Sequence, residues 1–117
     1  MTLQEFYEQV GGNAQKTLTR LPSEAMVRKF ILKYPGDPSY QQLADALKAK
    51  DWTLAFRAAH TLKGVSQNLG FDQMYVSSQV ITEALRGEKP LTDWSLWDAV
   101  QHDQKILIDA ITALRQA

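Results

Sequence analysis

Residues 51–72 read DWTLAFRAAHTLKGVSQNLGFD, and this stretch decides the fold. Up to Leu69 its apolar residues recur every three or four positions, which is the period of one face of an α-helix. The carboxylate of Asp51 can cap the first turn, and Gly70 can close the last turn in a left-handed conformation. A second helix begins almost at once, at Asp72. A connection this short allows only an antiparallel pair of helices.

Glycine and proline residues divide the rest of the chain into further segments with helical periodicity. The expected helices span residues 3–10, 13–20, 23–34, 37–50, 51–69, 72–86, and from 92 or 93 to the end. Asp37 is expected to cap its helix, with Pro38 as the first helical residue. Phe71 is expected to pack toward Val76 as a hydrophobic staple.

The predicted fold is all-α. It is an antiparallel up-down four-helix bundle over about residues 37–116, with additional short N-terminal helices over about residues 1–34 packed across it. The length of 117 residues favours a single domain over the whole chain, 1–117. Two sets of side chains are assigned to the core by helical spacing: the stripe Met26, Val27, Phe30, Ile31, and the aromatic residues Phe71, Tyr75, Trp94, Trp97.

Composition excludes several classes of function. The chain carries 13 basic and 13 acidic side chains, so no net charge favours binding to nucleic acid or to an anionic membrane. No segment has the roughly 20 consecutive apolar residues that span a bilayer, and the N-terminus has no export pattern. Cysteine is absent, which fits a reducing compartment. We therefore expect a cytoplasmic protein, and a monomer because the fold needs no partner to complete its core.

The helix over residues 51–69 carries His60 on its outer face. At about 100° per residue, the apolar side chains form an arc centred near Ala55 and Leu62, and His60 lies well outside it. The outward face also holds Arg57, Gly64 and Gln67, with Lys63 and Phe56 at its other margin. The imidazole should therefore be accessible to another molecule.

The neighbours of His60 suit a phosphoryl acceptor. Histidine alone supplies an unprotonated ring nitrogen near neutral pH without strong perturbation of its pKa. Lys63, one turn later, can offset negative charge on a phosphoryl group. Gly64 costs about 1 kcal/mol in a helix relative to alanine, and its missing side chain would let a partner approach the imidazole closely.

The sequence closely resembles the histidine-containing phosphotransfer (HPt) domains of phosphorelays. The resemblance is sharpest in His60-Thr61-Leu62-Lys63-Gly64, followed by Ser66, Leu69 and Gly70, and it includes Leu43, Ala46-Leu47, Asp51-Trp52 and Ala58-Ala59 before them. It covers roughly residues 30–85. The resemblance implies a four-helix bundle whose exposed histidine is phosphorylated on Nε2 by the aspartyl phosphate of a receiver domain, with His60 as acceptor, Lys63 as helper and Gly64 as the small residue.

One position departs from the family pattern. Many members place a glutamine on the next helix, where it hydrogen-bonds the imidazole, and the equivalent position here is Thr82. Gln79 and Glu83 are its neighbours, and the sequence leaves open whether any of the three orients His60.

These observations predict a phosphocarrier in a two-component His-Asp phosphorelay, not an enzyme, because no ATP-binding or phosphate-binding loop is visible. Its expected partners are response-regulator receiver domains, a hybrid histidine kinase, or both, docking on Phe56, Arg57 and Gln67. No cofactor or metal site is expected on this chain, and Mg²⁺ is expected on the receiver.

Two further interpretations concern charge and binding. Lys48, Lys50, Arg57 and Lys63 form a basic neighbourhood that could steer an acidic receiver surface. His102 is interpreted as an ordinary surface residue. The alternative function is a helical bundle that binds a receiver, or serves as a scaffold, without exchanging phosphate.

Overall fold

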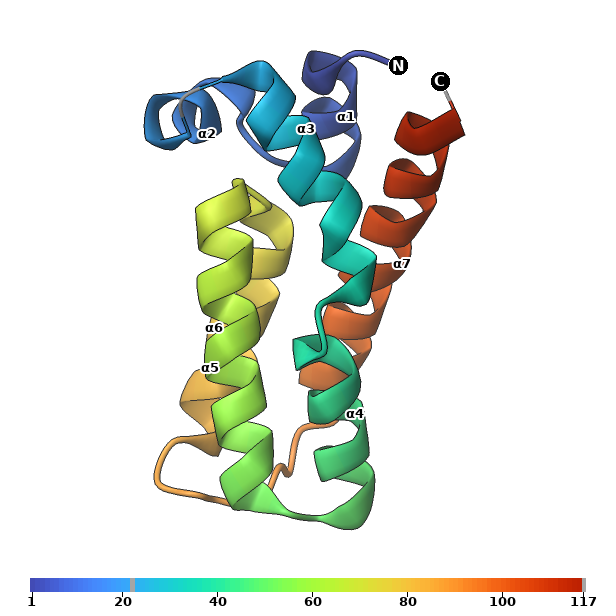
Figure 1. Ribbon diagram of the computed structural model, residues 1–117. Coiled ribbons are helices and arrows are strands. Elements are labelled where there is room, and N and C mark those ends of the chain that lie inside the picture. The colour runs from blue at the N-terminus through green and yellow to red at the C-terminus, as the bar shows by residue number, and fades with distance from the viewer. Residues whose placement is uncertain (22, 117) are drawn as a thin grey trace.

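The computed structural model describes residues 1–21 and 23–116 (Figure 1). Within these residues there are seven α-helices, one 3-10 turn and no β-strand. The elements are α1 (Leu3–Val10), α2 (Ala14–Arg20), α3 (Glu24–Lys33), η1 (Tyr34–Gly36), α4 (Ser39–Ala49), α5 (Trp52–Leu69), α6 (Asp72–Leu85) and α7 (Ser95–Gln116). None of the helices in this part of the chain is long and apolar enough to cross a membrane. The all-helical prediction is confirmed.

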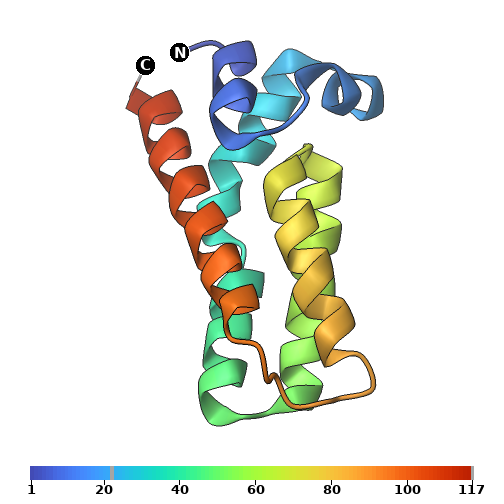
Figure 2. The ribbon, with the colours of Figure 1, turned by 180° about the vertical axis from the view of Figure 1, so that it is seen from behind.

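The helices α4 to α7 make the most extensive contacts of the fold, with α5 packed on α4 and α6, and α6 packed on α7. Figures 1 and 2 show α4 beside α5, α5 beside α6, and α7 returning along the other side of the molecule. The most extensive packing joins α5 to α6 and to α4. The turn η1 connects α3 to α4, so α3 and α4 together span the length of α7. Helix α5 is thus packed on two sides and open on a third.

Both ends of α5 are formed by the predicted residues. The Asp51 carboxylate accepts a hydrogen bond of 3.1 Å from the Leu54 amide at the first turn. At the other end Gly70 has a φ of +72°, and a Cβ there would collide with the Thr17 hydroxyl. Glycine is therefore required at Gly70 both by its backbone conformation and by the approach of α2.

The N-terminal helices cover the turn between α5 and α6. The hydroxyls of Tyr7 and Thr17 donate to the Leu69 carbonyl at 2.6 and 3.3 Å, and Arg20 donates to the Gln67 carbonyl at 2.7 Å. The last carbonyls of a helix have no partner within the helix. Side chains from α1 and α2 therefore satisfy the C-terminal end of α5.

An aromatic cluster lies beneath this cap. Phe71 is fully buried, and its ring centroid lies 5.3 Å from that of Tyr34, 6.0 Å from that of Phe6 and 6.4 Å from that of Tyr7. Buried aromatic side chains remove large apolar areas from water, and edge-on contacts add to the stabilisation. The cluster ties α1 and η1 to the start of α6.

Several predicted core contacts are wrong. Val76 is 56% exposed, so it forms no staple with Phe71, which packs toward the N-terminal helices instead. Trp94 is 43% exposed because it lies in the connection before α7 rather than on a packed helix face. In α3 only Val27 and Ile31 are buried; Met26 and Phe30 are each 38% exposed, so the buried stripe is narrower than predicted.

Two helix starts also differ from prediction. Helix α4 begins at Ser39, one residue after the expected Pro38, although the Asp37 carboxylate still accepts a hydrogen bond of 2.8 Å from the Ser39 amide. Helix α7 begins at Ser95, whose amide donates to the Asp93 carboxylate at 3.0 Å. In both cases the aspartate lies two residues before the helix and forms a local turn there.

Candidate functional site

His60 lies at the middle of α5, and its side chain is exposed as the periodicity predicted. Lys63, one turn further along, is half-buried. Gly64 lies on the same outer face, and a Cβ built on it would have no neighbouring atom within 4 Å. Nothing in the packing of this chain therefore requires a glycine at residue 64. The space above it is open to another molecule.

The Phe56 ring is a neighbour of His60, and an arginine that follows α6 lies over this ring. The Phe56 ring centroid lies 6.1 Å from that of His60, with the two planes tilted by 32°. The Arg86 guanidinium carbon, just after α6, lies 5.3 Å from the centroid of the same Phe56 ring. Arginine over an aromatic face is an attractive cation–π arrangement. Phe56 is therefore half-buried beneath Arg86, and it links the phosphoacceptor candidate to a charged group.

Glu83 holds the guanidinium in place. Its two carboxylate oxygens accept hydrogen bonds of 2.9 and 2.8 Å from Nε and Nη2 of Arg86. These bonds hold the pKa of the Glu83 carboxyl below its ordinary value, and the charges of Arg86, Lys63 and His60 lower this pKa further. Glu83 is thus an exposed, ionised carboxylate within electrostatic range of His60. Sequence reasoning named Glu83 only as a neighbour of Thr82 and missed Arg86.

Thr82 does not take the orienting position of the family glutamine. Its side chain is completely buried, and its hydroxyl donates a hydrogen bond of 2.6 Å to the Ser78 carbonyl within α6. Gln79 is half-buried, and Glu83 is engaged by Arg86. Because threonine replaces the family glutamine at residue 82, the polar side chain on the α6 side of the site is instead the carboxylate of Glu83.

The three predicted docking residues lie on different sides of His60. Phe56 faces α6, as described. Arg57 is exposed on the side of α4, where it borders a groove of about 500 Å³ with Ala46, Ala58 and Thr61. Gln67 is exposed two turns beyond His60, and its carbonyl is bound by Arg20 of α2. The structure therefore places Phe56 beside His60, and it places Arg57 and Gln67 at the edges of the same face.

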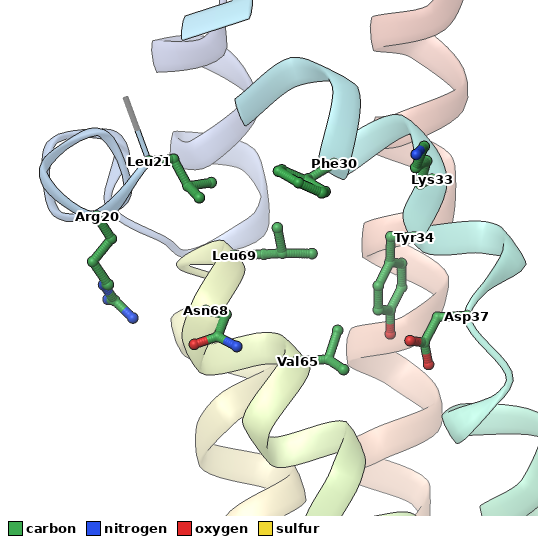
Figure 3. A pocket seen from close by; sticks show the side chains of 9 residues that line it. All are labelled: Arg20, Leu21, Phe30, Lys33, Tyr34, Asp37, Val65, Asn68 and Leu69. Atoms are coloured by element: carbon green, nitrogen blue, oxygen red, sulfur yellow. The ribbon is translucent and has the colours of Figure 1, made fainter. Parts of the chain in front are cut away.

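A hollow of about 460 Å³ lies beyond this face, between α5 and the N-terminal helices. Figure 3 shows Val65, Asn68 and Leu69 of α5 facing Phe30 and Tyr34 across it. Arg20, Leu21, Lys33 and Asp37 complete its lining. Its walls are mostly apolar, and Val65 and Asn68 lie one to two turns after His60. Val65 and Leu69 lie on the side of α5 opposite His60, so the hollow opens on a different side of this helix from the imidazole.

Metal ligands do not gather at this site. Among the residues that the structure describes, no group of three or more histidine, cysteine, aspartate or glutamate side chains could hold a metal ion. The charged groups around His60 are instead Lys63, one turn along α5, and the Glu83–Arg86 pair, whose guanidinium lies over the Phe56 ring beside His60. This set suits electrostatic contact with an anionic group on the imidazole.

The fold and the site define a class of small helical proteins that present one histidine from the middle of a helix, flanked by basic side chains. The chain belongs to the Hpt domain family, whose model matches residues 36–117. Membership implies a part in histidine phosphotransfer in phosphorelays, as the resemblance of the sequence predicted. Comparison with curated proteins and with solved structures found no match.

Proposed function

We propose that this protein is a phosphocarrier: His60 accepts a phosphoryl group from the aspartate of a receiver domain, or from a kinase, and passes it to another receiver. The proposal rests chiefly on one observation. His60 is exposed in the middle of α5, with Lys63 one turn away and open space above Gly64. In this proposal α4 to α7 serve as the antiparallel up-down four-helix bundle that presents the histidine.

The transfer needs no catalytic group on this chain beyond the acceptor and its neighbours. The unprotonated ring nitrogen of His60 attacks phosphorus, the P–N bond forms, and the P–O bond to the receiver's aspartate breaks, which leaves a carboxylate. Positioning and charge neutralisation dominate phosphoryl transfer. Mg²⁺ on the receiver would supply most of that neutralisation, and Lys63 would offset charge from this side. The protein is then a carrier, not an enzyme.

The partner would dock on the open face of α5. Phe56, Arg57 and Gln67 surround His60 on this face, and the half-buried Phe56 ring offers apolar contact to a receiver surface. The proposed partners are response-regulator receivers, a hybrid histidine kinase, or both, met by a monomer in the cytoplasm.

The direct test is to mix the purified protein with a receiver already phosphorylated on its aspartate, in the presence of magnesium, and to follow the label. Wild type should become labelled rapidly, with acid-labile, alkali-stable phosphate, and His60→Ala should not. His102→Ala is the matched control because His102 is also an exposed histidine on a helix, in α7. Lys63→Ala should still be labelled, but more slowly. If several receivers bind wild type but leave it unlabelled, the carrier proposal is wrong, and the protein would instead be a docking module.

A further inference from the structure

The site next to His60 contains a negative charge that is held in place by its own counter-ion. Glu83 and Arg86 form a bidentate pair at 2.8 and 2.9 Å, and their side chains are 53% and 54% exposed. Arg86 also lies over Phe56, whose ring neighbours His60. Glu83 contacts Arg86, and Arg86 in turn contacts Phe56 of α5. The ion pair therefore links the carboxylate to the edge of the phosphoacceptor site.

Phosphorylation of His60 would change the charge balance of this cluster. A protein-bound phosphoryl group carries roughly 1.5 to 2 negative charges near neutral pH. Like charges close together disfavour one another, so Glu83 would destabilise the phosphorylated form. The same carboxylate occupies the donors of Arg86, the cation held next to Phe56, and so competes with the phosphoryl group for them.

We propose that Glu83 is a positioning residue that raises the phosphoryl-transfer potential of His60, by repelling the bound phosphoryl group and by retaining Arg86 as its own partner. This inference rests on the proposed carrier function. The expected consequence is that the protein gives up its phosphoryl group more readily than it would with a neutral residue at position 83. Arg86 is the opposing element, because it stabilises the phosphorylated form whenever it leaves Glu83.

The test is to let a phosphorylated receiver and this protein reach equilibrium and to measure how much phosphoryl group each holds. Wild type is compared with Glu83→Gln. Glutamine keeps the shape of the side chain and removes its charge. We expect the ratio of phosphorylated to free protein to rise about two- to fivefold, the range that exposed charge pairs give. Asp109→Asn is the matched control, since Asp109 pairs with Lys105 at 3.0 Å in an equally local helix pair on α7. It should leave the ratio unchanged.

Two further measurements separate an electrostatic role from a merely structural one. The effect of Glu83→Gln should shrink at about 1 M salt, where charges on the surface are screened within a few ångströms. Arg86→Gln should lower the phosphorylated fraction, and in the double variant it should cancel part of the gain. If Glu83→Gln behaves like Asp109→Asn while wild type is labelled, the inference is wrong and the carrier function stands. If wild type takes no label, both are wrong.

Discussion

The Tyr7 hydroxyl donates a hydrogen bond of 2.6 Å to the Leu69 carbonyl, which joins residues 62 positions apart. Replacement of Tyr7 by phenylalanine leaves that buried carbonyl with only the longer bond from Thr17. We expect Tyr7→Phe to lower the free energy of unfolding by about 1 kcal/mol, measured by urea denaturation. Tyr75→Phe, at a half-buried tyrosine of α6, is the control. If both variants lose the same free energy of unfolding, the hydrogen bond to Leu69 does not stabilise the protein more than an ordinary tyrosine hydroxyl does.

Gly64→Ala should separate stability from function. Alanine is favoured over glycine in a helix by about 1 kcal/mol, and no atom lies within 4 Å of the added Cβ. The variant should therefore unfold at higher denaturant concentration while it accepts phosphate more slowly, since the new methyl group occupies the partner's approach to His60. Gly70→Ala should instead lower the free energy of unfolding, because a Cβ at residue 70 would collide with the Thr17 hydroxyl. A Gly64→Ala protein with unchanged transfer kinetics would rule out clearance as the role of Gly64.

Tyr34 predicts a dependence of stability on alkaline pH. Its hydroxyl donates to Gln104 at 2.6 Å, so Tyr34→Phe should cost about 1 kcal/mol near neutral pH. Burial raises the pKa of Tyr34 above its ordinary value of 10.0, and the contribution of this group to stability is therefore complete below pH 10.0 and declines as the pH rises beyond it.

The difference in unfolding free energy between wild type and Tyr34→Phe should accordingly stay constant from about pH 8 to about pH 10 and narrow from there to about pH 11. Burial also raises the pKa of Tyr7 and Tyr40, but both are present in the two proteins and cancel in the difference. A constant difference over this range would mean that Tyr34 ionises as easily in the folded protein as in the unfolded chain.

The basic side chains near His60 are expected to steer the partner. Lys50 ends α4 with a φ of +58°, and Arg57 is exposed on α5. Lys50→Asn, which tolerates that backbone conformation, combined with Arg57→Gln should slow transfer at low salt and weaken its dependence on salt concentration. Stopped-flow or rapid-quench measurement over a salt series checks this. An unaltered salt dependence would exclude steering by these two residues.

Local chemistry explains which parts of the fold were predictable. Helix α5 was placed correctly because Asp51 and Gly70 mark its ends through their own backbone conformations and hydrogen bonds, within a few residues of sequence. The exposure of His60 followed from the same helix, since periodicity alone puts it opposite Ala55 and Leu62.

Contacts between helices were not predictable in the same way. Arg86 reaches Phe56 only because α5 and α6 pack in one particular register, and no spacing within either helix encodes that register. Met26 and Phe30 were assigned to the core because their helix face was known, but the width of the buried stripe depends on what packs against it. Phe71 was predicted to be a core residue, but the rings that pack against it come from α1 and η1, at least 37 positions away in the sequence.

The aromatic cluster around Phe71 extends beyond the segment that the family model matches. The family match starts at residue 36, inside η1, so it omits Phe6, Tyr7 and Tyr34, three rings that enclose Phe71. A fragment that begins at residue 36 would lack these rings, and the Phe71 side chain at the N-terminal end of α6 would become exposed to water. The segment that the family model matches and the segment that packs around Phe71 therefore have different boundaries in this chain, and the matched segment depends on α1 and η1 to keep Phe71 out of water.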